Sequence, residues 1–421
     1  MPTYLSELAQ RRAEPGQRGI YSVCSAHPWV LEAAMRRHLS ASGPLLIEAT
    51  CNQVNQYGGY TGMKPCDFRN LVYRIAAQAG FPQERILLGG DHLGPFPWQH
   101  LNAEAAMANA CALVDLFVRD GYCKIHLDTS MGCADDPHPL PGHLIAERAA
   151  RLCAVAEAAA AGSGPVYVIG TEVPTPGGST DEAEMSVTCA DRAEEALRLH
   201  RQAFITAGVD QAWNRVIALV VQPGVEFGNE SVEDYKPEKA KQLANMLTQH
   251  PGLIFEAHST DYQLAANLVA LVRDGFAILK VGPALTYAMR QALFALAAVE
   301  EACLPAGKAS GLRQRVEAAM LENPQHWQKH YPGNPGQQHR LRVHSYSDRI
   351  RYYWADNNVQ RAVNQMLSNL DSWGIQEILL GDFLPIQYQK VRSGTLSNQS
   401  LPLIFDAIGS ALDPYIAASG A

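Results

Sequence analysis

The feature that most constrains the fold is a series of eight short runs of β-forming residues, separated by stretches whose apolar residues recur at helical spacing. The runs cover residues 19–25, 45–50, 86–95, 124–128, 166–172, 215–221, 253–258 and 276–281. This alternation predicts parallel strands joined by helices, and eight strands predict a closed (β/α)8 barrel, or TIM barrel. A doubly wound open sheet is the alternative, but it usually has fewer strands and often a glycine-rich phosphate-binding motif, which this sequence lacks after its first run.

The character of the sequence changes after the eighth run. We therefore expect a barrel over residues 1–300 and a helical extension packed on it over residues 301–421. Within the extension, residues 348–354 combine arginines with aromatic side chains. Such a stretch suits either single-stranded nucleic acid or a helix packed through its aromatic rings, and the acidic chain favours the packed helix.

Composition narrows the classes of partner. The formal net charge of −8 and the pI near 6.0 disfavour a surface that coats nucleic acid or binds an acidic membrane. The first residues lack the pattern of a signal peptide, and no apolar run approaches the ~20 residues of a membrane span. The nine cysteines are scattered and form no CxxC pair, so we expect reduced, mostly buried thiols in a cytoplasmic protein.

Polar residues recur at the ends of the predicted strands. They are Asp91, His92, Asp128, Glu172, His258 and Lys280. Because the carboxyl ends of barrel strands meet at one mouth, we expect these side chains to form a cluster. Two imidazoles and two carboxylates can hold a divalent metal and move a proton, which suits polarising a carbonyl group. The alternative is a set of structural residues, since isolated histidines are more often hydrogen-bonded than metal-bound.

Two other stretches carry polar side chains toward this mouth. In the fourth run Lys124, His126 and Asp128 alternate with apolar residues, so this polar row must face a cavity or pair internally. The loop over residues 51–60, which includes Asn52, is rich in amide side chains. Long loops after strands often carry function, so this loop favours a ligand or an interface.

The predicted strand ends resemble those of the class II, metal-dependent ketose-bisphosphate aldolases. The resemblance rests on Asp91-His92, Asp128-Thr129-Ser130, Glu172 with Gly177-Gly178, His258-Ser259 and Lys280-Val281. The whole chain, extension included, resembles more closely the Z subunits of D-tagatose-1,6-bisphosphate aldolase. This closer resemblance rests on the runs at residues 22–28, 52–62, 89–95, 170–174, 222–227 and 256–262.

The resemblance to the class II enzymes implies roles for three residues. Asp91 would be the acid/base on the substrate's C4 hydroxyl, and His92 and His258 would bind zinc. Those enzymes use a third histidine after strand six, where this sequence reads Gln222-Pro223-Gly224-Val225. Because a catalytic zinc usually has three protein ligands, its loss should weaken metal binding unless another side chain substitutes. The candidates for that substitution are Glu172, which is also a candidate catalytic residue, Gln222 and Glu226.

A sugar phosphate would bind at the same mouth. Phosphate is expected at the loops after strands seven and eight, around Ser259, Thr260, Gly282 and Thr286. We expect Asn52, Asp128 and Lys280 to complete the substrate-binding set.

Two functions follow. The resemblance to the Z subunits implies a non-catalytic accessory subunit, required for the full activity and stability of a catalytic Y subunit and chaperone-like, in catabolism of galactitol or N-acetylgalactosamine through tagatose 6-phosphate. The alternative is a metal-dependent aldolase or epimerase that itself acts on a phosphorylated ketose. The missing histidine favours the first function and the retained polar cluster the second. A tagatose-6-phosphate kinase, an older label in this family, is poorly supported because no GxxxxGK[ST] loop is present.

Overall fold

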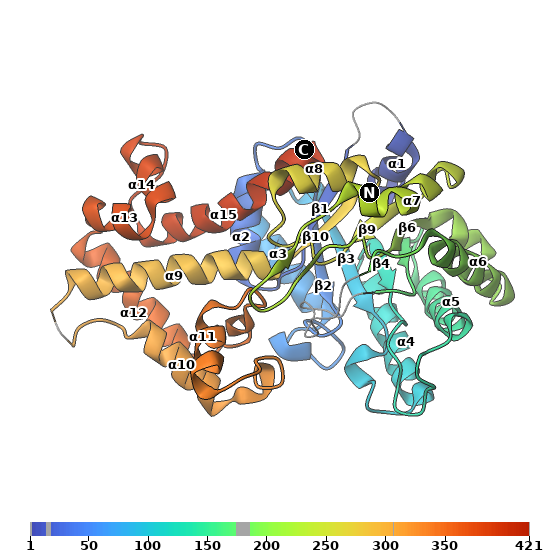
Figure 1. The fold of residues 1–421 in the computed structure, drawn as a ribbon, viewed down its shortest axis with the longest axis horizontal. Coiled ribbons are helices and arrows are strands. Elements are labelled where there is room, and N and C mark those ends of the chain that lie inside the picture. Colours follow the sequence, from blue (N-terminus) through green and yellow to red (C-terminus); the bar gives the residue numbers. More distant parts are fainter. Residues whose placement is uncertain (1, 14–17, 174–185, 306, 421) are drawn as a thin grey trace.

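A closed barrel forms the centre of the structure, a computed structural model that describes residues 2–13, 18–173, 186–305 and 307–420. Its eight parallel strands follow the order β1-β10-β9-β6-β5-β4-β3-β2 (Figure 1). They are β1 (Ile20–Val23), β2 (Leu45–Thr50), β3 (Ile86–Leu93), β4 (Lys124–Leu127), β5 (Val166–Ile169), β6 (Val216–Val220), β9 (Ile254–Ala257) and β10 (Ile278–Val281). Each strand falls within one of the eight predicted runs. The predicted barrel is confirmed, and the doubly wound alternative is wrong.

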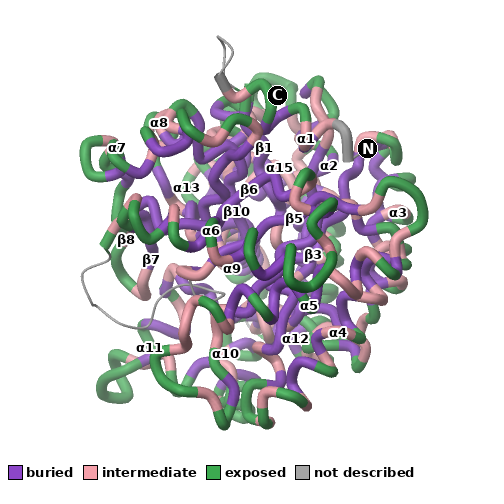
Figure 2. The backbone as a smooth tube through the Cα atoms, turned by 90° about the vertical axis from the view of Figure 1, so that its right-hand side faces the viewer, coloured by how far each residue is buried: buried purple, intermediate pink, exposed green. Residues whose placement is uncertain are grey.

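Helices surround the barrel and pack on it through apolar faces. They are α2 (Pro28–His38), α3 (Pro65–Ala79), α4 (Ala103–Arg119), α5 (Gly142–Ala159), α6 (Ala190–Thr206), α7 (Pro237–Met246), α8 (Ala265–Arg273) and α9 (Pro283–Cys303). In α4 the side chains of Met107, Ala110, Val114 and Phe117 are buried, at the three- and four-residue spacing of one helix face. Figure 2 shows the buried backbone concentrated in the strands and the inner helix faces.

The barrel interior is layered from apolar to charged. The end at which the strands begin is closed by α1 (Pro2–Gln10), whose Leu5 packs among inward residues such as Ile20, Ile254 and Ile278. Since side chains two residues apart share one face of a strand, the next inward position along β9 and β10 holds Glu256 and Lys280. The inward-facing side chains are thus apolar where the strands begin and charged nearer the mouth where the strands end.

The C-terminal helices extend the fold beyond the barrel. They are α10 (Leu312–Glu322), α11 (Pro335–His344), α12 (Asn357–Trp373), α13 (Glu377–Phe383), α14 (Pro385–Arg392) and α15 (Ser400–Ser419). Figure 1 shows α9 running out of the barrel among them and α15 returning beside it. Of the helices in the described residues, α15 is the one long and apolar enough to cross a membrane. It packs on α2, α8 and α9, so its apolar residues contact other helices of the fold.

Three features of the chain were not foreseen. The sequence patterns did not indicate α1 or the small antiparallel ribbon of β7 (Glu226–Phe227) and β8 (Val232–Glu233). In place of a packed helix, residues 348–354 contain only a 3₁₀ turn, Arg349–Tyr352, although the rings of Tyr353 and Trp354 are buried as expected. Arg290 on α9 anchors this segment through an ion pair of 2.7 Å with Asp348.

Candidate site at the barrel mouth

A bulge at the end of β3 turns two consecutive side chains toward the barrel interior. Neighbouring residues of a regular strand face opposite ways, yet Asp91 and His92 are both buried and both bond to residues of β4 and its following loop. The register with β4 shifts between Gly90 and Leu93, and His92 has a φ of 49°, in the left-handed region. Non-glycine residues in that region are strained and often sit at functional sites.

Gly94 lets the chain leave this bulge. A Cβ atom at that position would lie 1.6 Å from the carbonyl oxygen of Asp128. We expect Gly94→Ala to destabilise the fold by more than about 4 kcal/mol, because backbone rather than a flexible side chain must move. Urea unfolding monitored by circular dichroism would measure the loss. As a control, Gly132→Ala would meet its nearest described atom at 3.6 Å, an ordinary contact, so comparable losses in both variants would contradict this explanation.

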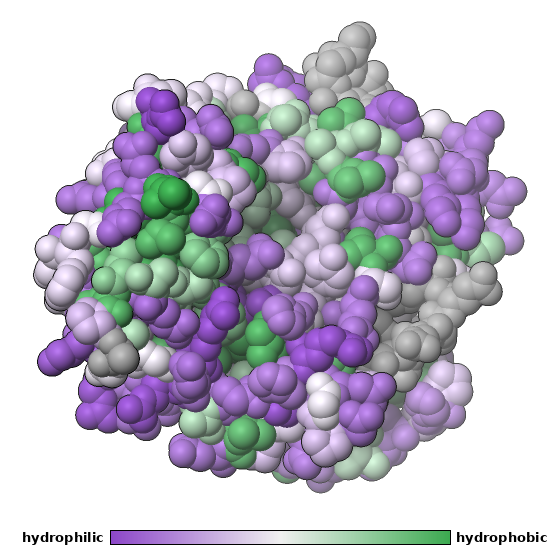
Figure 3. All heavy atoms as spheres, turned by 60° about the vertical axis from the view of Figure 1, so that its left-hand side comes forward, coloured by the Kyte–Doolittle hydropathy of each residue, from purple (hydrophilic) through white to green (hydrophobic). Residues whose placement is uncertain are grey.

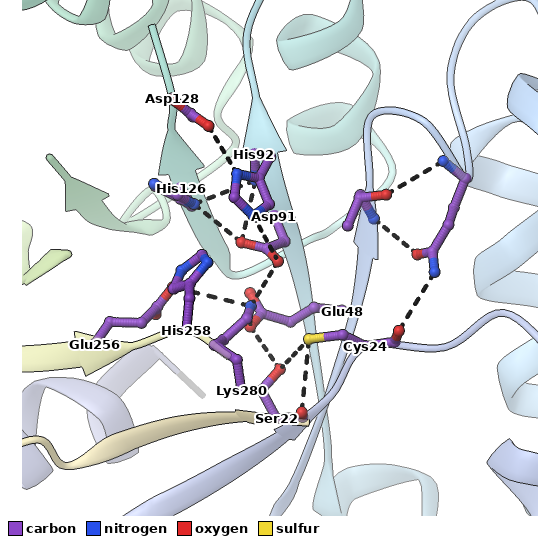
Figure 4. Close-up of polar contacts among 12 residues, drawn as sticks. Ser22, Cys24, Glu48, Asp91, His92, His126, Asp128, Glu256, His258 and Lys280 are labelled. Carbon is purple, nitrogen blue, oxygen red and sulfur yellow. Dashed lines mark hydrogen bonds and ion pairs between the residues drawn. The ribbon is translucent and has the colours of Figure 1, made fainter. Parts of the chain in front are cut away.

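Asp91 and His92 lie in a network of carboxylates and imidazoles (Figure 4). His92 Nδ1 is 2.7 Å from Asp128 Oδ2, and His126 Nδ1 is 2.9 Å from Asp91 Oδ1. Burial by itself would lower the pKa of His92, but the Asp91 and Asp128 carboxylates outweigh it and raise that pKa. Burial dominates at His258, whose pKa falls to about 4. The two imidazoles that were predicted to act together therefore favour different protonation states.

Below them lies a fully buried ion-pair network. Lys124 Nζ is 2.7 Å from both Glu48 Oε1 and Glu256 Oε2. Lys280 Nζ contacts Glu48 and lies 2.9 Å from Asp91 Oδ2. Burial by itself would raise the pKa values of Asp91 and Glu256, but the lysines, with Lys280 beside Asp91 and Lys124 beside Glu256, hold both well below their usual range.

The three polar side chains that alternate along the β4 run, Lys124, His126 and Asp128, are paired internally. Lys124 pairs with Glu48 and Glu256, His126 with Asp91, and Asp128 with His92. Glu48 and Glu256 were missed as partners, although a single acid inside each of two apolar strands was a signal for them. A buried acid needs a cation, and Lys124 and Lys280 were the lysines on strands.

A cavity of about 380 Å³ opens above this network. Barrel residues Asn52, Asp91, His92, His258, Ser259, Lys280, Gly282 and Thr286 line it, together with Arg351, Tyr352 and Trp354 of the extension. A volume of this order suits a small-molecule ligand. The structure thus brings most of the predicted site residues to one cavity and adds a wall from the extension, which the sequence did not indicate.

The expected phosphate position is occupied by the chain itself. Asp261 accepts hydrogen bonds from the backbone N–H groups of Gly282 and Ala284, at the N-terminus of α9. Thr260 donates to the carbonyl oxygen of Lys280, and Thr286 donates to Asp348. A helix N-terminus favours an anion, and here the Asp261 carboxylate supplies it.

Glu172 lies apart from the cluster. Its carboxylate accepts a bond of 2.6 Å from Arg192, and it is not among the residues that line the cavity. Gly177 and Gly178, which follow it in the aldolase-like pattern, lie outside the described residues. The expectation that Glu172 joins Asp91, His92 and His258 in one group is therefore wrong: Glu172 pairs with Arg192 and does not line the cavity that those three residues share.

The cysteines lie as free thiols, as expected, but only three of the nine are buried. Cys24 lines the cavity, where burial raises its pKa to about 12. Such a thiol is protonated at neutral pH and is a poor nucleophile.

The donor set at the mouth does not suit a catalytic zinc ion. Asp91, His126, Glu256 and His258 offer ligand atoms within 4.8 Å of one another, and His126 Nε2 is buried without a hydrogen-bond partner. However, Lys280 lies against Asp91, so its ammonium group would stand close to the metal. An ammonium and a divalent ion about 4 Å apart repel by about 8 kcal/mol at an effective dielectric constant of about 20.

The proposed substitute ligands are also engaged elsewhere. Gln222 Oε1 accepts from the backbone N–H groups of Gly224 and Val225, and Glu226 Oε1 accepts from that of Phe227. His92, one of the two predicted ligands, uses Nδ1 on Asp128. We therefore route no chemical step through a metal at this mouth.

A zinc titration checks this conclusion. We expect no tight zinc binding by the purified chain, and we expect Lys280→Met to bind zinc at least about tenfold more tightly, because it removes the repelling ammonium group. Isothermal titration calorimetry would measure both affinities, with the exposed Lys329→Met as control. Submicromolar binding by the unmodified chain that is lost in His258→Ala would contradict it.

Comparison with known proteins identifies the family. The family model for D-tagatose-1,6-bisphosphate aldolase subunit GatZ/KbaZ-like proteins matches residues 5–420. A solved structure from Sinorhizobium meliloti 1021, described as a "probable tagatose 6 phosphate kinase", is 50% identical, with a TM-score of 0.89 over 95% of this chain and 100% of that one.

Two aldolases are more distant matches. The YdjI aldolase from Escherichia coli K12 is 12% identical, with a TM-score of 0.41 over 89% of this chain and 96% of that one. The fructose-bisphosphate aldolase from Campylobacter jejuni is 14% identical, with a TM-score of 0.41 over 91% and 92%. The family match along almost the whole chain, together with the 50% identity to the Sinorhizobium protein, leads to one conclusion: this chain belongs to the GatZ/KbaZ-like family of D-tagatose-1,6-bisphosphate aldolase subunits.

Proposed function

We propose that the chain is a cytoplasmic, non-catalytic accessory subunit of a class II D-tagatose-1,6-bisphosphate aldolase, needed for the full activity and stability of the catalytic Y subunit. The pathway would be catabolism of galactitol or of N-acetylgalactosamine, and the subunit would act in the manner of a chaperone. Membership of the GatZ/KbaZ-like family supports the assignment of this chain to an aldolase complex. The observation that carries the non-catalytic part is Lys280, whose ammonium group lies against Asp91, a member of the one group of candidate metal donors among the described residues, and so disfavours a divalent ion there.

Mixing the purified subunits tests this proposal. We expect the chain and a class II Y subunit to elute together from a size-exclusion column as one complex. We also expect the lifetime of Y-subunit activity at elevated temperature to lengthen when the chain is present. Separate elution with an unchanged lifetime would refute the accessory role.

The second candidate is an aldolase or epimerase that acts on its own. The observation in its favour is the cavity, where Asp91, His92 and His258 meet and an acid/base pair could act on a ligand hydroxyl. If this function is real, Asp91→Ala abolishes lyase activity of the isolated chain. An unmodified chain without activity in zinc-supplemented buffer would remove this candidate.

The name of the Sinorhizobium protein raises phosphoryl transfer as a third function, which we do not propose here. The sequence has no phosphate-binding GxxxxGK[ST] loop. The α9 N-terminus, which could hold a phosphate, is taken by Asp261.

A further inference from the structure

The wall that the C-terminal extension gives to the cavity carries positive charge without a bound carboxylate. Arg351 lines the cavity and bonds only to the carbonyl oxygens of Ser347 and Asp348 and to the hydroxyl oxygen of Tyr352. A guanidinium group has five N–H donors, so two remain unused among the described residues. Arg349, two residues earlier, also makes no ion pair with any residue that the structure describes, and its Nε is buried without a partner there.

The acids near Arg351 are committed to other groups. Asp348 accepts from Arg290 and Thr286, and Asp261 accepts from the backbone at the start of α9. Arg351 is half-buried and Arg349 is buried. A cation that has lost part of its water without gaining a carboxylate is costly, because the protein does not replace that water. Such a cost is commonly recovered when a ligand supplies the anion.

Neighbouring donors point to the same kind of ligand. Trp354 also lines the cavity, is only 5% exposed, and has an indole N–H that is buried without a partner. The hydroxyl group of Tyr352 lies 3.1 Å from Arg351 Nη2, and the Tyr352 ring meets that of Tyr60 with centroids 5.0 Å apart. Guanidinium, indole and phenol groups together form a site rich in donors, which matches an oxyanion.

The floor of the cavity has the opposite character. Asp91, His92 and His258 lie there among carboxylates and imidazoles that can exchange hydrogen bonds with hydroxyl groups. The ammonium group of Lys280, which also lines the cavity, is paired with Glu48 and Asp91. A second anionic group would be repelled by Asp91 at the floor and by Asp261 at the start of α9. The cavity is therefore polarised, with its anion-accepting end on the extension.

We propose that the cavity binds an anionic polyhydroxy compound, such as a sugar phosphate or a sugar acid, with the anion on Arg351 and the hydroxyl chain on Asp91, His92 and His258. The proposal extends the proposed function, in that an accessory subunit would itself hold a ligand of the sugar phosphate class. It also gives the extension a role in binding, so that the site is complete only when barrel and extension are packed together.

Calorimetric titration of the full chain alone tests the proposal. The probes are D-tagatose 6-phosphate, D-galactonate and inorganic phosphate, which separate the phosphate, the carboxylate and the bare anion. We expect the unmodified chain to bind at least one of the two sugar anions at least about tenfold more tightly than inorganic phosphate, because the floor contacts its hydroxyl groups. If neither sugar anion binds more tightly than inorganic phosphate, the proposal is overturned.

Variants of Arg351 locate the anion. Arg351→Met should weaken binding of that sugar anion at least about tenfold, and Arg351→Lys should weaken it less, because the charge remains while the fork of donors is lost. Arg361→Met is the matched control, since Arg361 is exposed on α12 and outside the cavity. Thermal melting shows whether Arg351→Met is folded, and Arg351→Lys serves in its place if it is not. Unchanged affinity in the folded variant, or no saturable binding by either sugar anion, overturns the proposal.

Because these titrations use the chain without a Y subunit, their outcome is independent of the accessory function. Loss of the proposed complex would leave the binding result standing, and absence of binding would leave the complex standing.

Discussion

Replacing Glu48 by leucine should lower the free energy of unfolding by about 3–5 kcal/mol, the usual cost of removing one partner from a buried ion pair. Glu48 is fully buried and contacts both Lys124 and Lys280, so its loss leaves two ammonium groups with fewer counter-charges. Leucine cannot accept either bond. Gly89 leaves room for the glutamate, since a Cβ atom there would lie 2.4 Å from Glu48 Oε1.

The measurement is urea denaturation of both proteins by circular dichroism at pH 7. The matched control is Glu104→Leu, because Glu104 is likewise paired with a cation, Arg151, but its side chain is 78% exposed. Exposed pairs contribute at most about 1 kcal/mol, so this variant should stay close to the unmodified chain. Equal, small losses in both variants would mean that the network under the mouth is solvated.

The same network sets the acid limit of stability. Asp91 and Glu256 have folded-state pKa values well below the ordinary 3.8 and 4.5. Groups with a depressed pKa stabilise the fold fully above their ordinary pKa, and that stabilisation is lost as the pH falls through the depressed values. We therefore expect stability to decline below a pH of about 4.5, and less so in a Glu256→Gln variant, after allowance for its lower starting stability. Melting temperatures of both proteins, measured at pH values from 7 to 3, would show both declines.

The second large effect concerns association with the proposed partner, the Y subunit. Four large apolar side chains on α12, α13 and α14 are exposed: Trp373, Ile378, Phe383 and Ile386. Figure 3 shows the side of the molecule toward which these helices project, with hydrophobic residues gathered over part of it. Exposed apolar patches often mark interaction sites, so we expect the proposed contact with the Y subunit to include these four residues.

Charges placed in this patch should prevent the complex. We expect the double variant Ile378→Glu, Ile386→Glu to weaken association with the Y subunit at least about a hundredfold, because a buried unpaired carboxylate at the centre of an interface costs several kcal/mol. Val269→Glu on α8, also an exposed apolar position, is the control. Analytical ultracentrifugation of the mixtures gives the affinities. Unchanged association in the double variant, or loss only in Val269→Glu, would place the interface elsewhere.

The fold could be predicted because its strands are locally encoded. Each barrel strand is a short apolar run with its own helix pattern behind it, and closure follows from the number of strands. The polar ends at Asp91, His92 and His258 could be placed at one mouth by the same geometry. What the runs did not show by themselves is which charges pair, because the partners of Glu48 and Glu256 lie on strands far from them in the sequence.

The site departs from the sequence prediction where the backbone departs from regular geometry. The bulge at His92 brings neighbouring side chains to one face, and no local pattern signals it. Asp261 reaches the start of α9 through a loop after β9, so its capture of the expected phosphate position depends on tertiary structure. Arg351 enters the cavity from 70 residues beyond β10, a contact that strand-by-strand reasoning does not reach.

Zinc-supplemented cleavage of D-tagatose 1,6-bisphosphate tests the central claim most directly, with three samples: this chain alone, a class II Y subunit alone, and the two mixed. We expect no cleavage by the chain alone, and a rate and a thermal lifetime in the mixture that exceed those of the Y subunit alone. Cleavage by the chain alone would contradict it, and would mean that Lys280 leaves Asp91 to make room for a metal.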